Sequence, residues 1–305
     1  MIRRVRRALL GIVSFALIFF VSGEIILRVF FASGETFTSH GGPIVARFER
    51  DFVFNKFDGP SRGPEPVDRR TPDQIRILVQ GDSITWGQGI RDEQDLFSFR
   101  LLNLLRDDNL NVQMAVLAKP GREIDDHKEQ LDRWGEAVAP NIIIYQWFVN
   151  DMELDHRGRP HARGRLWRRL FFHKTMMSHS YLWFFLDYGL GRALPKGSQR
   201  YQDYLLANYR AGSPRWEESV EIFREWLASA KRLTPNILVA LYPMSDHEGK
   251  RALGAIYEDF SELCISEGVE VIDLWQPLSA LAKQKELFAS RYDDHPGAAA
   301  HDVIA

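Results

Sequence analysis

Five short apolar runs alternate with helical patterns between residues 75 and 274, and this alternation constrains the fold more than any other feature. Each run is rich in β-branched or aliphatic residues and ends near glycine, proline or polar residues, as buried strands do. The runs are Ile75–Gln80, Val112–Leu117, Ile142–Phe148, Ile237–Tyr242 and Val269–Leu274. Strands that alternate with helices form a parallel sheet with helices on both faces. We therefore expect an α/β domain.

The segments between these strands carry apolar residues at helical spacing. The predicted helices are Asp95–Asp107, Glu123–Val138, Trp216–Lys231 and Leu253–Glu267. A further helix signal covers Ala298–Ala305 and stops after about two turns, so we expect the chain to be short at this end. The stretch 157–215 interrupts the alternation.

The N-terminus combines an arginine cluster with a long apolar stretch. The arginines are Arg3, Arg4, Arg6 and Arg7, and no acidic residue lies among them. Ala8–Phe31 follows, with Glu24 and Arg28 as its only charged residues. As a helix this stretch would be about 36 Å long, which exceeds the roughly 30 Å hydrocarbon core of a bilayer. Arginines before the span and none directly after it predict a transmembrane anchor with a cytoplasmic N-terminus.

Two other interpretations of the apolar stretch remain open. Ala32-Ser33-Gly34 loosely resembles a signal-peptide cleavage site, although the stretch is longer than a usual signal-peptide core and contains two charges. A buried helix of a soluble protein would leave the arginine cluster unexplained. Both the anchor and the signal peptide would export residues 35–305. A single cysteine, Cys264, suits an oxidising compartment because no wrong pair can form within the chain.

Charge and cysteine content exclude several functions. The 39 basic and 41 acidic residues give a net charge of −2, so no global basic field points to nucleic acid. One cysteine rules out an internal disulfide and a cysteine-rich zinc site. The H-E-x-x-H, P-loop and G-x-G-x-x-G patterns are absent, so we expect no metal and no nucleotide cofactor. Nothing in the sequence indicates the oligomeric state.

Polar clusters follow three of the predicted strands, at the sheet edge where ligands bind in α/β folds. They are Gly81-Asp82-Ser83, Lys119-Pro120-Gly121 and Asn150-Asp151, and a fourth cluster, Asp293-Asp294-His295-Pro296, lies near the C-terminus. Each alone is compatible with a helix cap or a turn. Together they supply a serine, a histidine and an acid, which nucleophilic catalysis requires. They also supply a glycine N–H and an asparagine amide, which can stabilise an oxyanion.

This constellation resembles the SGNH (GDSL-type) hydrolase family. The first block appears as Gly81-Asp82-Ser83-Ile84-Thr85, and the others, in the family's order, as Val116–Gly121, Phe148–Asp151 and Asp293–Pro296. Val116 stands where asparagine is common, and Val149 replaces a commoner small residue. The stretch from Phe54-Asn55 to Arg62-Gly63-Pro64-Glu65 resembles the lead-in of membrane-anchored members. The resemblance covers roughly residues 50–305.

The resemblance implies a role for each site residue. Ser83 would be the nucleophile and also the first oxyanion donor, through its N–H. Gly121 and Asn150 would be the second and third donors, and His295 the general base and then general acid. The position three before His295, where the family commonly has its aspartate, is Tyr292 here.

The assignment of the orienting acid uses strand geometry. Residues two apart in an extended segment face the same way and neighbours do not. We therefore assign Asp293 over Asp294. We expect Asp82 and Asp151 to bind loop backbone around the site, and His301 to be a surface or packing residue.

We therefore expect a flavodoxin-like three-layer α/β/α sandwich with a mainly parallel five-stranded sheet, preceded by an N-terminal transmembrane helix. The expected division is an anchor at 1–34, a lead-in at 35–74, and an SGNH hydrolase domain at 75–305. The reaction would be hydrolysis of an acyl ester, in a lipid or an O-acylated carbohydrate of the envelope. An O-acyltransferase with the same site and a non-catalytic anchored binding module are the alternatives.

The stretch 157–215 is first basic and then aromatic. Arginines and Lys174 crowd residues 157–174 among Trp167 and other apolar residues, and Tyr181–Leu186 (YLWFFL) follows. Basic and aromatic residues together are typical of a segment that binds a membrane surface or an anionic substrate. The alternative is a solvated charged face with an aromatic stripe packed on the core.

Overall fold

The computed structural model describes the N-terminal helix and most of the α/β region. The described residues are 2–30, 62–64, 71, 73–90, 92–154, 175–176, 179–186, 197–245, 250–284, 286–290 and 293–305. Within these ranges, the side chains of 2–5, 8, 9, 30, 197–200, 290 and 293 are not described. The basic cluster predicted between residues 157 and 174 lies outside the described residues.

All five predicted strands are present, and they form one parallel sheet with the order β2-β1-β3-β4-β5. The strands are β1 (Ile75–Gly81), β2 (Val112–Ala118), β3 (Ile142–Trp147), β4 (Ile237–Leu241) and β5 (Glu270–Asp273). The chain adds β2 on one side of β1 and the other three strands on the opposite side. This is the flavodoxin-like order, in which the direction of winding reverses between β1 and β3.

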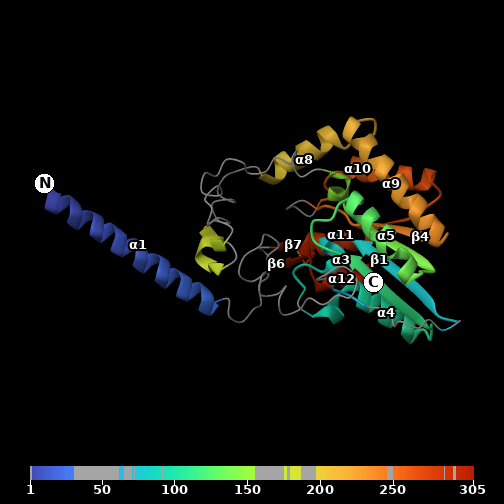
Figure 1. Cartoon of the computed structure of the whole chain (residues 1–305), viewed down its shortest axis with the longest axis horizontal. Helices are drawn as coiled ribbons and strands as arrows, with labels where there is room; N and C mark the ends of the chain where they lie inside the picture. Colours follow the sequence, from blue (N-terminus) through green and yellow to red (C-terminus); the bar gives the residue numbers. More distant parts are fainter. Residues whose placement is uncertain are drawn as a thin grey trace.

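Helices cover both faces of the sheet and make the protein a three-layer α/β/α sandwich (Figure 1). The main helices are α4 (Phe97–Asp107), α5 (Ile124–Val138), α9 (Pro214–Leu233), α10 (Gly254–Ser266), α11 (Trp275–Gln284) and α12 (Ala298–Ile304). Leu78 packs in the core formed with α5, α9 and α10. Its neighbours Ile77 and Val79 pack on the other face, against α4 and the end of α12. Both faces of the strands are therefore apolar, which explains their continuous runs of apolar residues.

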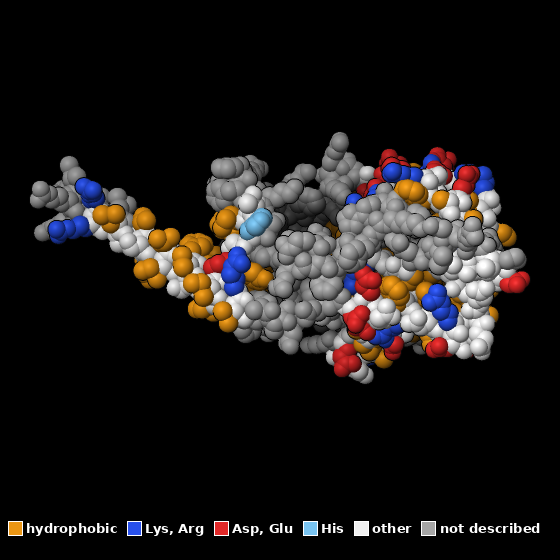
Figure 2. All heavy atoms as spheres, turned by 60° about the horizontal axis from the view of Figure 1, so that its bottom comes forward, with side chains coloured by type: hydrophobic (Ala, Val, Ile, Leu, Met, Phe, Trp, Pro, Cys, Tyr) orange, Lys and Arg blue, Asp and Glu red, His pale blue; other side chains and the backbone are white. Residues whose placement is uncertain are grey.

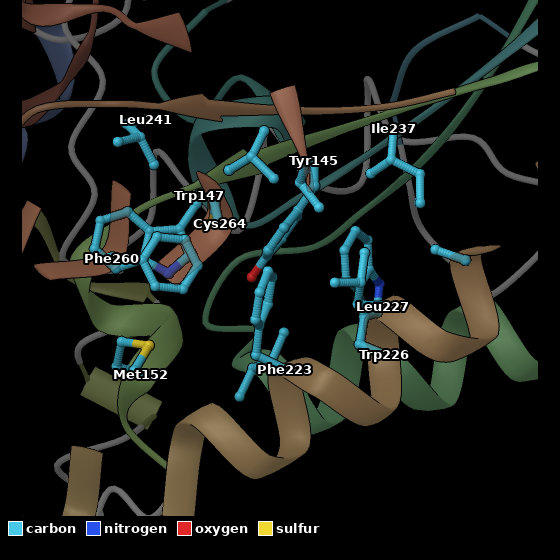
Figure 3. Packing of buried hydrophobic residues seen from close by; sticks show 14 of the residues in the cluster. Tyr145, Trp147, Met152, Phe223, Trp226, Leu227, Ile237, Leu241, Phe260 and Cys264 are labelled. Atoms are coloured by element: carbon cyan, nitrogen blue, oxygen red, sulfur yellow. The ribbon is translucent and has the colours of Figure 1, made fainter. Parts of the chain in front are cut away.

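Aromatic side chains fill the larger core, between β3 and helices α9 and α10 (Figure 3). Trp147 stacks on Phe260 with ring centroids 4.2 Å apart. Trp226 lies against Tyr145 at 4.7 Å. These contacts join β3, the central strand, to two helices that lie more than 60 positions further along the chain.

Helix caps explain why two predicted boundaries shift. Asp92 caps the short helix η1 (Glu93–Asp95). Because η1 occupies these residues, α4 starts at Phe97 and not at the predicted Asp95. Ser213 accepts the N–H of Trp216, and Pro214 occupies the first turn of α9, which begins two residues before its predicted start. Both are ordinary N-terminal signals of a helix.

Several elements have no counterpart in the sequence prediction. They are α3 (Ser83–Trp86), η2 (Val149–Met152), α8 (Gly197–Asn208), α11, and the antiparallel pair β6 (Phe288–Ser290) and β7 (Asp293–Pro296). The short elements offer too few residues for a periodic pattern. The helix α8 lies in the stretch 157–215, which interrupts the predicted alternation of strands and helices.

The helix α1 (Ile2–Phe30) extends away from the α/β body (Figure 1). Its segment Leu10–Val29 has a mean hydropathy of 2.3 and none of it is buried in the protein, so it is long and apolar enough to cross a membrane. Apolar side chains cover α1 along its length (Figure 2). An N-terminal helix of this kind is compatible with a membrane anchor or with a signal sequence.

His301 is a packing residue, one of the two possibilities that we predicted for it. It is fully buried in α12, and its Nδ1 accepts the N–H of Phe97 at 3.1 Å. Burial, together with the positive charges of Arg100 and Arg62, lowers the pKa of His301 to about 3. The folded protein therefore holds this imidazole neutral.

We predict that replacing His301 with glutamine makes the protein less sensitive to acid. The folded pKa lies below the unfolded one, so His301 stabilises the fold fully above the unfolded pKa, and this contribution is lost as the pH falls towards 3. Between pH 6.5 and 5, the wild type should lose about 2 kcal/mol more stability than His301→Gln. Urea unfolding of the full chain in detergent at both pH values measures the difference, with the exposed His179→Gln as control. Equal losses in His301→Gln and the wild type would contradict the prediction.

Candidate active site

The predicted site residues gather at the carboxyl edge of the sheet. Ser83 follows β1, Gly121 follows β2 and Asn150 follows β3. The registers Gly81↔Ala118 and Gln80↔Tyr145 bring these three strand ends to one edge. The edge includes the reversal between β1 and β3, where ligands bind in sheets of this order.

Ser83 is the first residue of α3 and is 8% exposed. Asp82 caps this short helix, because its Oδ1 accepts the N–H of Ile84 at 2.9 Å. Ser83 therefore lies in the turn between β1 and α3, beyond the carboxyl end of the strand. Asp82 binds backbone next to the site, as predicted.

Gly81 makes room for a second contact of the same turn. A Cβ at this position would lie 2.6 Å from Oε1 of Gln146, and still closer to Oγ1 of Thr85. These two atoms form a hydrogen bond of 2.8 Å between α3 and β3. Any larger residue would break that bond, so steric crowding explains why glycine precedes Asp82.

His295 contacts Ser83 directly: its Nε2 lies 2.8 Å from the Ser83 Oγ. His295 belongs to β7, which pairs with β6, and the N–H of Gly297 donates to the carbonyl of Leu287. A Cβ on Gly297 would lie 2.8 Å from the carbonyl oxygen of Phe288. The hairpin and the close approach at Gly297 together fix where the imidazole lies.

The two candidate acids lie next to each other in β7. The backbone of Asp293 is part of the strand, two positions before His295, and its side chain lies outside the described residues. Asp294 is exposed. The choice between them stays a prediction.

Two backbone N–H groups are available at this edge. Within the described part of the chain, no acceptor takes the N–H of Ser83 or of Gly121. Gly121 has φ +75° and open space around a Cβ, so its conformation, not crowding, favours glycine. Asn150 is half-buried in η2. The structure therefore gathers the predicted oxyanion donors at the same edge as Ser83.

A buried polar cluster lies beneath the site. The carboxylate of Asp151 accepts hydrogen bonds from the Tyr145 hydroxyl at 2.8 Å and the Phe148 N–H at 3.2 Å, and His127 Nε2 lies 3.9 Å away. Burial raises the pKa of Asp151 to about 6, against the opposing effect of His127. Asp151 thus binds loop backbone, as predicted, and fixes the turn that presents Asn150.

We predicted no role for His127, although the sequence contains a signal for its burial. In the predicted helix Glu123–Val138, His127 is three residues after Ile124 and four before Leu131, so it shares their apolar face. Both neighbours are buried, and so is His127. Its backbone carbonyl also accepts from Gln80 at 2.9 Å, and the Gln80 amide oxygen accepts from Trp226 at 2.9 Å.

Arg62, in the predicted lead-in, braces the loop after the serine. Its side chain is almost fully buried, and its Nη1 donates to the carbonyls of Gly87 and Ile90 at 2.9 and 2.7 Å. The guanidinium also lies 5.5 Å from the ring of Trp86, at the end of α3. Burial lowers the pKa of Arg62 to about 10. A segment that precedes the first strand thus belongs to the body of the site.

No group of three or more histidine, cysteine, aspartate or glutamate side chains suited to a metal ion occurs among the described residues.

No family model and no curated protein matches this chain. Solved structures with a similar backbone include TesA, with 13% identity, a TM-score of 0.48, and coverage of 75% of this chain and 93% of that one. The acetyl xylan esterase AlAXEase has 11% identity and a TM-score of 0.47, over 75% of this chain and 96% of its own. A catalytic mutant of Axe2, an acetylxylan esterase from Geobacillus stearothermophilus, has 14% identity and a TM-score of 0.45, over 78% and 93%. The fold assignment rests on the strand order and register described above.

We predict that Arg62→Met destabilises the protein, although methionine keeps much of the apolar volume. The substitution leaves the buried carbonyl of Ile90 without a donor among the described residues, at about 1–3 kcal/mol, and the carbonyl of Gly87 keeps only the N–H of Ile90. Thermal unfolding of the full chain, followed by tryptophan fluorescence, measures the loss. Arg224→Met is the control, because it removes an exposed ion pair with Glu267 that should be worth about 1 kcal/mol or less. Equal shifts in the two variants would contradict a bracing role for Arg62.

Proposed function

We propose that this chain is a membrane-anchored serine esterase of the SGNH (GDSL) type, which hydrolyses an acyl ester through an acyl-enzyme on Ser83. The observation that carries the proposal is the 2.8 Å contact between Ser83 Oγ and His295 Nε2. These residues are 212 positions apart, so no local turn or cap accounts for the contact. A hydroxyl within hydrogen-bond reach of an imidazole is the arrangement that activates a serine.

In the first half of the reaction, Ser83 Oγ attacks the carbonyl carbon of the ester and gives its proton to His295 Nε2. The electrons of the carbonyl bond move to its oxygen, and the N–H groups of Ser83 and Gly121 and the amide of Asn150 stabilise this oxyanion. The intermediate collapses when the bond to the alcohol oxygen breaks. That oxygen takes the proton from His295, and the acyl group remains on Ser83.

Water completes the cycle by the same steps. His295 takes a proton from a water molecule, whose oxygen attacks the acyl carbon. The bond to Ser83 Oγ then breaks, Oγ regains the proton from His295, and the carboxylic acid leaves. We assign Asp293 to hold the other ring nitrogen of His295 and to stabilise the imidazolium, as the acid of a catalytic triad does.

The proposed location follows from the N-terminal helix. Arginines before the apolar segment favour a cytoplasmic N-terminus, so residues 35–305 would lie on the exported side. We propose that the substrate is an ester of an envelope lipid or carbohydrate. The anchor would occupy residues 1–34 and the hydrolase domain residues 75–305, joined by the lead-in.

A fluorophosphonate probe tests the proposal, because it phosphonylates only an activated serine. We expect the full chain in detergent to be labelled at Ser83. Ser83→Ala should abolish labelling, and His295→Ala should slow it by at least about 10³-fold. His179→Ala is the control, since this histidine is exposed and far along the chain from the site. A folded wild type that takes up no probe would contradict the proposal and favour a binding module.

A second prediction separates the two candidate acids. Asp293→Asn should lower the rate of hydrolysis of a short acyl ester by about 10²–10⁴-fold, because the imidazolium loses its partner. Asp294→Asn should change it by less than about two-fold, because an exposed side chain on the other side of the strand does not reach His295. Steady-state rates of both variants decide the matter. The opposite ranking would assign Asp294 as the acid.

A further inference from the structure

Glu24 and Arg28 are charged residues inside the apolar segment of α1, and the structure gives both of them partners. Their side chains form an ion pair, with Arg28 Nε 2.8 Å from Glu24 Oε1. A charged side chain within a membrane span is costly unless it is paired. The pair alone leaves most of the hydrogen-bonding capacity of the carboxylate unused.

The remaining capacity is taken up by residues 179–182, which are more than 150 positions further along the chain. Glu24 accepts hydrogen bonds from the Ser180 hydroxyl at 2.8 Å and from the N–H groups of Tyr181 and Leu182 at 3.2 and 3.0 Å. Arg28 donates to the carbonyl of His179 at 2.7 Å. The carboxylate thus satisfies the free N–H groups at the start of the helical segment 181–186, which otherwise need a cap.

Apolar packing supports the same contact. Leu182 lies against Gly23: a Cβ at position 23 would be only 3.1 Å from Leu182 Cδ2. Tyr181 packs with Leu27 and Phe185. Small residues at such positions allow close approach of helices in membranes. Segment 181–186 is therefore docked on α1 by charge, hydrogen bonds and shape together.

The position of Glu24 along α1 gives the depth of this contact. Glu24 is five residues before Val29, the end of the apolar segment, which corresponds to about 8 Å along a helix. Interfacial helices bury their apolar face about 5–10 Å into the boundary of headgroups and acyl chains. In a bilayer that α1 spans, the docked segment would lie at the depth where a membrane takes up aromatic side chains.

We propose that residues 179–186 bind the lipid surface beside α1 and form a second, interfacial attachment of the protein to the bilayer. Tyr181, Leu182 and Phe184 are buried, whereas Trp183 and Phe185 are partly exposed and Leu186 is 37% exposed. These last three side chains supply the face for lipid. The occupant is the bilayer because the segment docks at Gly23 and Leu27, which belong to the exposed apolar segment Leu10–Val29. This attachment rests on the proposed membrane anchor and does not depend on the proposed catalysis.

Depth-dependent quenching tests the lipid contact. Cys264 is buried and is the only cysteine, so Cys264→Ala with Leu186→Cys provides one site for an environment-sensitive fluorophore. In phosphatidylcholine vesicles, a dibrominated phosphatidylcholine should reduce its emission at least about two-fold. The control is Leu104→Cys, on α4, where the native side chain is 54% exposed and no quenching is expected. Equal emission loss at the two sites would overturn the lipid contact.

Variants of α1 test the docking. Glu24→Ala should bring the quenching at position 186 down to the level of the Leu104 site, because the segment loses its cap. Ser22→Ala, on an exposed position of the same helix, should leave it unchanged. Thermal unfolding followed by tryptophan fluorescence checks that the α/β body is intact in both variants. Persistent quenching in Glu24→Ala would overturn the docking on α1. If the fluorophosphonate probe failed to label Ser83, the quenching at position 186 and its loss in Glu24→Ala would still support the lipid contact.

Discussion

The burial of β1 on both faces is the constraint from which the site follows. Its alternate side chains enter two separate cores, as is usual for strands of a parallel sheet, and both of its neighbours run parallel to it. Parallel neighbours bring their carboxyl ends to the same edge. Residues that follow β1, β2 and β3 are therefore close in space however far apart they are in sequence. The winding reverses between β1 and β3, which leaves this edge open for polar side chains.

The carboxyl edge is supported from below by hydrogen bonds rather than by apolar packing alone. Thr85 and Gln146 join α3 to β3, while Asp151 and Tyr145 hold the turn after β3. Both pairs are buried, and a hydrogen bond in the interior of a protein is electrostatically stronger than the same bond in water. Ser83 lies in α3 and Asn150 lies in the turn after β3. Because both of these segments are bonded to β3, they cannot shift independently of each other. Rigid support of this kind is what a preorganised site requires.

Periodicity predicted the central sheet because every strand is an apolar run between turn signals. It predicted the long helices for the same reason, and it placed the polar clusters at one edge. It did not predict β6 and β7, because their few residues carry no pattern and their pairing depends on the rest of the fold. The position of His295 was thus obtained from resemblance, whereas its distance from Ser83 required the structure. Arg62 belonged to a stretch with no apolar run, and its burial depends on Trp86 and on two carbonyls of a distant loop.

Arg62 also changes where the folded unit begins. Judged by hydrophobic pattern, the domain starts with β1, and everything between it and α1 is a tether. However, Arg62 precedes β1 and its guanidinium donates to the carbonyls of Gly87 and Ile90. This part of the segment is therefore buried in the α/β domain. A protein that begins at Ile75 would keep the whole sheet. It would have a polar cavity, in place of the Arg62 side chain, beside the loop that follows α3. The minimal autonomous unit must therefore begin at or before Arg62, not at the first strand of the sheet.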